Sequence, residues 1–111
     1  MFGPPEIGDL LRDTRWDGGQ HWGTIIFDKS GRTAKYVLPD GETKGEIYVQ
    51  GGIGGYSSPL IGLGEWHESS GKQGAILIGG RCNESSHCEN LEIKWGPGLT
   101  AEVALFRLDV V

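Results

Sequence analysis

The sequence predicts an all-β domain, namely an antiparallel β-sandwich of about seven strands, with a small β-barrel as the alternative. Glycine accounts for 20 of the 111 residues without a three-residue period, which indicates many turns and bulges rather than a fibrous repeat. From residue 22 onward the apolar residues recur with a period of two, which is typical of half-buried strands. Strands do not alternate with helical segments. Because the strands are short and unevenly spaced, the sandwich is favoured over the barrel.

Length and composition indicate a single domain over residues 1–111. The chain is long enough for one modest core and too short for two. Hydrophobic residues make up 37% of the sequence and are clustered, which predicts a folded domain rather than a disordered chain.

A helix is expected only near the N-terminus, within residues 4–14. Ile7, Leu10 and Leu11 follow the i, i+3, i+4 spacing of one helical face, and the prolines precede them, where a helix tolerates proline. The pattern predicts at most one or two turns that pack against one end of a sheet.

Three strands are predicted in the first half of the chain, over residues 22–29, 32–38 and 44–50. Residues 28–31 and 39–41 separate them and carry the Asp, Pro and Gly chemistry of tight turns. The alternation places Ala34, Tyr36 and Leu38 on one face of the second strand and Ile47 with Val49 on one face of the third.

In the second half, strands are predicted over residues 73–79, 89–95 and 100–111. The first is continuously apolar, which predicts cover on both faces, and the second alternates with Leu91, Ile93 and Trp95 inward. Residues 50–59 contain too many glycines for a strand interior, so a long surface loop or a sheet edge is predicted there.

The charge pattern argues against two classes of partner. The formal net charge of −5 is unlike a nucleic-acid-binding surface, which normally needs a basic stripe. The sequence has no run of like charges, and its longest apolar run, at residues 75–78, is far shorter than the roughly 20 residues of a membrane-spanning helix. Nucleic acid and membrane are therefore not expected as partners.

Cys82 and Cys88 are predicted to form a disulfide, because a polar, turn-prone segment separates them and no third cysteine competes. Two independent thiols are the alternative. An N-glycosylation sequon at residues 83–85 lies between them. The chain start lacks signal-peptide features, which fits either a cytoplasmic protein or a mature secreted domain. A disulfide would favour a secreted or extracellular location.

Two stretches, residues 16–22 and 65–68, combine tryptophan with hydrogen-bonding side chains. A sugar offers an apolar face and a rim of hydroxyls, which an indole and neighbouring polar groups would match. The leading hypothesis is thus a non-enzymatic, lectin-like carbohydrate-binding module. Its candidate ligand-binding residues are Trp16, Asp17, Gln20, His21, Trp66 and His67. The competing interpretation assigns these tryptophans to the core, as expected for Trp95.

Two other function classes stay open. A secreted protein-binding domain, such as an effector, inhibitor or adhesion module, would act through the glycine-rich residues 51–61 and Tyr56. A small hydrolase would use His67 with Glu65 and Glu68, although Glu68 should point away from the other two on a strand. A ribonuclease built on His21, Glu65 and Arg32 is a further variant. Enzymatic activity is less favoured than binding, and the oligomeric state stays open.

No cofactor is predicted. The histidines lack the spacing of a transition-metal site, and no calcium-binding loop motif is present. Calcium bound by Asp13, Asp17 and Asp28 is left open as the one metal alternative.

Overall fold

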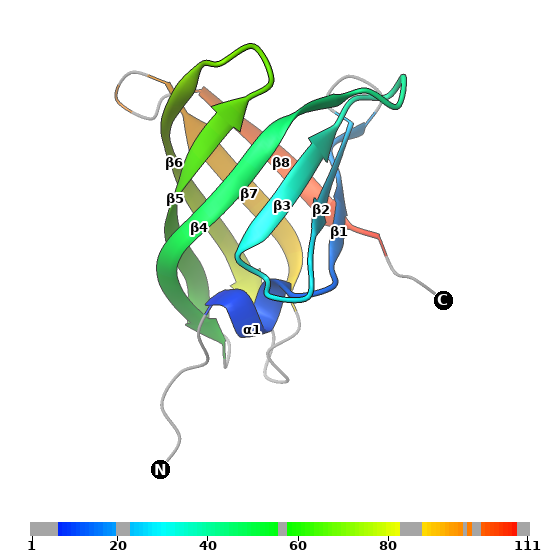
Figure 1. Ribbon diagram of the computed structural model, residues 1–111. Helices are drawn as coiled ribbons and strands as arrows, with labels where there is room; N and C mark the ends of the chain where they lie inside the picture. The colour runs from blue at the N-terminus through cyan, green and yellow to red at the C-terminus, as the bar shows by residue number, and fades with distance from the viewer. Residues whose placement is uncertain are drawn as a thin grey trace.

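Eight antiparallel strands follow one another around a closed barrel, and a short helix lies at one end (Figure 1). The computed structural model describes residues 7–19, 23–55, 58–82, 88–96, 98 and 101–108. The strands are β1 (Arg15–Asp17), β2 (Thr24–Phe27), β3 (Thr33–Val37), β4 (Thr43–Gly55), β5 (Ser58–Glu68), β6 (Gln73–Cys82), β7 (Cys88–Trp95) and β8 (Ala101–Arg107). The all-β antiparallel fold is confirmed, and the barrel is the architecture that this chain adopts.

Closure depends on the short strand β1, which pairs with β2 on one side and with β8 on the other. Trp16 lies opposite Ile25 of β2 and opposite Arg107 of β8. Sequence periodicity does not reveal β1, because a three-residue strand is too short to display alternation.

The glycine-rich segment belongs to the barrel wall, so the prediction of a loop at residues 50–59 is wrong for the described part. β4 continues through Gly55, and β5 begins at Ser58. The register between β4 and β5 shifts between Val49 and Gly51 and again between Ile53 and Gly55. Glycines occur at such irregularities because a residue without Cβ tolerates the local bend and the close approach of the neighbouring strand.

The prediction that the apolar strand at residues 73–79 is covered on both faces is also wrong. Ile76 and Ile78 are buried inside the barrel, whereas Ala75 is exposed and Leu77 is half-buried on the outer wall. A barrel with one wall buries only its inner face, so apolar residues on the outer face stay in contact with solvent.

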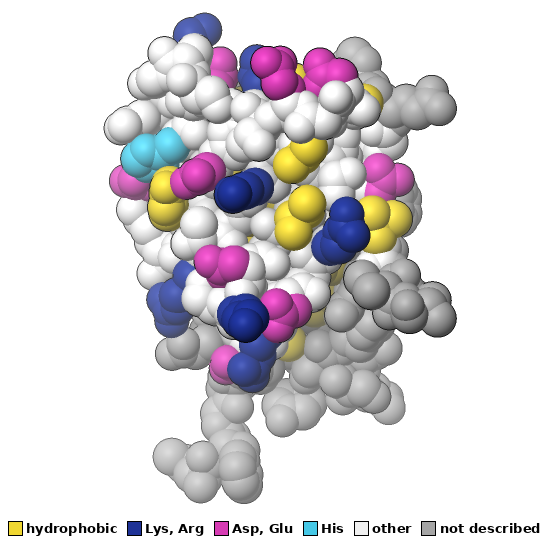
Figure 2. Space-filling model, turned by 45° about the vertical axis from the view of Figure 1, so that its right-hand side comes forward, with side chains coloured by type: hydrophobic (Ala, Val, Ile, Leu, Met, Phe, Trp, Pro, Cys, Tyr) yellow, Lys and Arg dark blue, Asp and Glu magenta, His cyan; other side chains and the backbone are white. Residues whose placement is uncertain are grey.

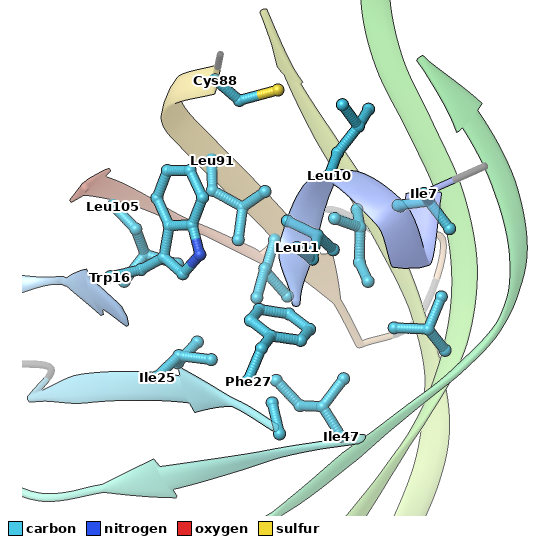
Figure 3. Close-up of a cluster of buried hydrophobic side chains, with 14 of the residues drawn as sticks. Ile7, Leu10, Leu11, Trp16, Ile25, Phe27, Ile47, Cys88, Leu91 and Leu105 are labelled. Atoms are coloured by element: carbon cyan, nitrogen blue, oxygen red, sulfur yellow. The ribbon is translucent and has the colours of Figure 1, made fainter. Parts of the chain in front are cut away.

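The expected N-terminal helix is α1 (Ile7–Leu11), and it covers one end of the barrel. Ile7, Leu10 and Leu11 are buried against the inward side chains of the strands (Figure 3). The backbone N–H of Asp13 donates to the Asp28 carbonyl (2.9 Å), which ties the chain after α1 to the turn between β2 and β3. Among the described residues, no helix has the length and hydropathy to span a membrane.

A chain of hydrogen bonds joins α1 to the buried core. The Trp16 indole N–H donates to Thr14 Oγ1 (2.8 Å), and the Thr14 hydroxyl donates to the Leu11 carbonyl (2.5 Å) at the C-terminus of the helix. This carbonyl is one of those that a helix leaves without an intrahelical partner. The buried polar atoms of Thr14 and Trp16 thus satisfy each other and anchor the helix.

Space for α1 comes from a glycine on the inner wall. A Cβ at Gly62 of β5 would lie 2.4 Å from Ile7 Cδ1, closer than side-chain atoms approach one another. Gly51 of β4 offers the contrast, because a Cβ there would meet no atom within 4 Å. The absence of a side chain at Gly62 therefore makes room for the helix, whereas its absence at Gly51 does not.

Gly62→Val should displace Ile7 and loosen α1, whereas Gly51→Val should leave the helix in place. We expect Gly62→Val to lower the free energy of unfolding by about 1–3 kcal/mol, the usual range for an overpacked core. Urea denaturation followed by tryptophan fluorescence would measure the change. Equal stabilities of the two variants would contradict this account of how the helix is seated.

Candidate functional site

A cavity of about 250 Å³ opens at the end of the barrel opposite α1. Its lining includes Leu38 after β3, Lys44 near the start of β4, Glu68 at the end of β5 and Trp95 at the end of β7. The helix α1 lies at the other end of the barrel, next to the turn between β2 and β3. Among the described residues, α1 and the core around it occupy the barrel interior on the far side of this cavity (Figure 3).

Three aromatic side chains form part of the cavity wall: Tyr36, Trp66 and Trp95. The pleat of the strands turns each inward, since successive side chains of a strand point to opposite faces. The rings of Tyr36 and Trp66 are 5.8 Å apart between centroids and are tilted by 59°. Burial raises the pKa of Tyr36, so its hydroxyl keeps its proton at neutral pH and can donate a hydrogen bond.

The position of Trp66 depends on Gly45, the residue of β4 that lies opposite Tyr36 in the sheet. A Cβ at Gly45 would lie 2.4 Å from Trp66 Cη2 and 2.6 Å from the His67 carbonyl oxygen. The indole of Trp66 therefore covers the bare backbone of Gly45. A larger residue there would push the ring into the cavity.

The rest of the wall is aliphatic. Ile25, Leu38, Ile47, Ile76 and Ile93 complete the apolar lining. A pocket this small with apolar walls suits a compact apolar group better than a group that needs many hydrogen bonds.

Among the described residues that line the cavity, the charged ones are Lys44 and Glu68, which lie at its mouth with Lys44 Nζ 3.7 Å from Glu68 Oε1. The Ser70 hydroxyl donates a hydrogen bond to the same oxygen of Glu68 (2.8 Å). This bond lowers the pKa of Glu68, and the positive charges of Lys44 and Lys72 act in the same direction. Glu68 is thus an anion at neutral pH.

The opposite side of the same wall carries a separate polar group. His67 Nε2 lies 3.0 Å from Glu65 Oε2, and the ring of His67 packs edge-on against Tyr48 with centroids 4.8 Å apart. The Tyr48 hydroxyl donates to Glu46. Figure 2 shows histidine among acidic side chains on the outer surface of the barrel. As expected for a strand, Glu65 and His67 share one face while Glu68 points to the other.

Among the described residues predicted to bind a sugar, Trp16, Trp66 and His67 do not line one site. Trp16 is 0% exposed in the core, so it offers no face on which a ligand could stack, and the surface role assigned to it is not retained. Trp66 faces the cavity, whereas His67 is the next residue of β5, so its side chain points to the other face of the wall. Asp17 accepts a hydrogen bond from the Gly19 backbone N–H (3.0 Å). Gln20 and His21 lie outside the described residues.

The other predicted sites are described only in part. Arg32 lies beside Gly8 of the helix, and its carbonyl accepts a hydrogen bond from the backbone N–H of Val49, which lies opposite Gly64 in the sheet. His21 lies outside the described residues, so the ribonuclease grouping of His21, Glu65 and Arg32 stays a prediction. Tyr56, proposed as a protein anchor, lies outside the described residues.

Of the candidate calcium ligands, Asp13 and Asp28 are joined by a backbone hydrogen bond, whereas Asp17 lies at the other end of β1, opposite Thr24. The carboxylate of Asp28 accepts hydrogen bonds from the Ser30 backbone and hydroxyl within its own turn. Within the described ranges, no group of three or more His, Cys, Asp or Glu side chains is arranged to hold a metal ion.

The cysteines lie opposite each other in adjacent strands. Cys82 of β6 pairs with Cys88 of β7, next to a register shift between Arg81 and Cys82. Directly opposed residues of antiparallel strands have Cα atoms about 4.5–5.5 Å apart, which falls within the range of disulfides. Cys88 is buried. The disulfide stays a prediction that this placement favours.

Sequence reasoning did not single out Tyr36, Lys44, Glu68 or Trp95 as binding residues. The alternation along β3 and β7 predicts that Tyr36 and Trp95 face inward, which by itself indicates packing in a core. The missing information is that the inner face is not filled at this end of the barrel, which depends on how all eight strands close.

Comparisons with known proteins give no further guide: no protein-family model, no curated protein and no solved structure matches the chain.

Gly45→Ala should displace the Trp66 ring and shrink the cavity, with a loss of about 1–3 kcal/mol in the free energy of unfolding. Gly74→Ala is the matched control, because Gly74 lies opposite Trp66 in β6 and a Cβ there would meet no atom within 4 Å. Two-dimensional NMR of the Trp66 indole N–H checks this. An unshifted Trp66 signal in Gly45→Ala would show that the ring does not depend on Gly45.

If Cys82 and Cys88 are bridged, the purified chain should be two hydrogens lighter than the reduced chain, and iodoacetamide should modify neither cysteine until a reductant is added. Intact-mass spectrometry before and after reduction measures both quantities. Alkylation of either cysteine without reductant would exclude the bridge.

Proposed function

We propose that this protein is a non-enzymatic binding module that holds one compact, largely apolar small molecule inside its barrel. The cavity at the open end carries the proposal, since a preformed apolar pocket with a few polar groups at its edge is the usual form of a small-molecule site. Eight-stranded barrels have interiors of the size that accommodates one small ligand.

The size and walls of the cavity narrow the ligand class. An apolar protein cavity of about 150 Å³ is large enough for benzene, so about 250 Å³ suits a molecule of one or two rings or a short branched chain. The aliphatic lining argues against a sugar, because sugar hydroxyls buried against isoleucine would lose their hydrogen bonds to water. The aromatic walls favour a ligand with a flat apolar face.

Binding suits the site better than catalysis does. Among the lining residues, the titratable groups are Tyr36, Lys44 and Glu68. Glu68 is held as an anion by its neighbours, which opposes a role as a proton donor near neutral pH. Tyr36 keeps its proton, which opposes a role as a base.

Neutral probes of increasing size, namely phenol, indole and 2-naphthol, would test the proposal by isothermal titration calorimetry and NMR. We expect at least one probe to bind and to shift the indole N–H signals of Trp66 and Trp95. The Trp16 signal should shift less than these two, because Trp16 does not itself line the cavity and contacts it only through its strand partner Ile25. Failure of all three probes to bind would refute the proposal.

Leu38→Trp should plug the mouth and weaken binding of the best probe by about tenfold or more, since it removes the space in which apolar surface is buried. Leu38 is half-buried, so the change should leave the folded state intact. Tyr48→Ala, which removes an aromatic side chain from the outer face, is the control and should leave the affinity unchanged.

A further inference from the structure

The polar groups at the mouth of the cavity differ in how much hydrogen-bonding capacity they have left. Glu68 accepts a hydrogen bond from Ser70 (2.8 Å), and two positive charges, those of Lys44 and Lys72, act on its carboxylate. Its charge is therefore already balanced. A ligand cation at this position would meet two ammonium groups as well as one carboxylate.

Lys44, in contrast, has hydrogen-bond donors that its ion-pair partner does not occupy. Its ammonium carries three N–H donors, and its ion-pair partner Glu68 is 3.7 Å away, beyond the length of a hydrogen bond. The Lys44 side chain is 47% exposed, and it lines the cavity. Nζ can thus turn toward an acceptor in the mouth at little cost in desolvation.

We infer that the ligand of this cavity is a compact amphipathic anion, whose apolar body lies between the aromatic and isoleucine walls and whose anionic group accepts hydrogen bonds from Lys44. The inference rests on the proposed function and adds the charge of the ligand. Carboxylate, sulfonate and phosphate share this chemistry, and a body of one or two rings meets the size limit.

The filled end of the barrel excludes a long-chain anion. The buried side chains of Ile7 and Leu11 fill the barrel beyond the cavity, so a ligand that enters from the mouth cannot extend through it. The apolar body must fit within about 250 Å³, while the charged group stays at the wetter rim. The arrangement places charge where solvent can still reach it, which limits the cost of removing an anion from water.

The aromatic wall also permits a competing interpretation, in which Tyr36, Trp66 and Trp95 attract a cation through their ring faces. The two positive charges beside Glu68 count against it. Probes that share one ring system but differ in charge distinguish an anionic ligand from a cationic one.

Three naphthalene probes provide this comparison: 2-naphthoate, 2-naphthamide and 2-naphthylmethylammonium. We expect 2-naphthoate to bind about tenfold more tightly than the neutral amide at low salt, the effect of one charge-assisted hydrogen bond at a partly exposed site. The ratio should fall as salt is added. Equal affinities of anion and amide, or tighter binding of the cation, would overturn the inference.

Lys44→Met should abolish the preference for 2-naphthoate and leave the affinity for 2-naphthamide unchanged, whereas Lys44→Arg should keep the preference. Lys35→Met is the matched control, because Lys35 is an exposed lysine on the outer face of β3. A preference that survives Lys44→Met would assign the anion to another group and refute the role of Lys44.

Different results would refute the binding cavity and the anionic character of its ligand. If none of the three naphthalene probes binds, or if one binds with an affinity that Leu38→Trp leaves unchanged, the cavity is not the binding site. If the amide binds and responds to Leu38→Trp but charge has no effect, binding stands and only the assignment of an anionic ligand is lost.

Discussion

The limited space inside a closed eight-stranded barrel is the constraint on which the rest of this structure depends. Each strand turns alternate side chains inward, and a barrel of this size has room for only part of them. The chain meets this limit with glycines on the inner wall. Gly62 makes room for Ile7 of the helix, and Gly45 makes room for the Trp66 indole. At these positions the missing side chain of glycine leaves space in the interior for a neighbouring side chain, in addition to the role of glycine in turns.

The two ends of the barrel use the available space differently. At one end, α1 enters and its apolar residues complete the core, anchored by the hydrogen bonds from Trp16 to Thr14 and from Thr14 to Leu11. At the other end, aromatic side chains border a cavity. The same closed wall thus provides a stable base and a preformed pocket. A preformed pocket favours binding, because less conformational freedom is lost when a ligand enters.

The barrel wall also separates residues that are neighbours in sequence. Trp66 and Glu68 belong to the interior, while Glu65 and His67 form a polar group on the outside. A motif read along the chain combined residues from both faces into one sugar site, and the pleat of β5 divides them. Trp16 was misplaced for a related reason: its sequence neighbours are polar and turn-forming, but pairing with β2 and β8 turns its side chain into the core.

The sequence pattern alone predicts the all-β class, the short N-terminal helix, and the inward faces that carry Ala34, Ile47, Leu91 and Ile93, because periodicity and turn chemistry are local properties. It determined neither the closure of the sheet nor the strand character of the glycine-rich segment. Closure rests on pairing between β1 and β8, which are far apart along the chain. The cavity follows from that closure, since its walls come from six different strands or their flanking turns and enclose space only when all of them are in place.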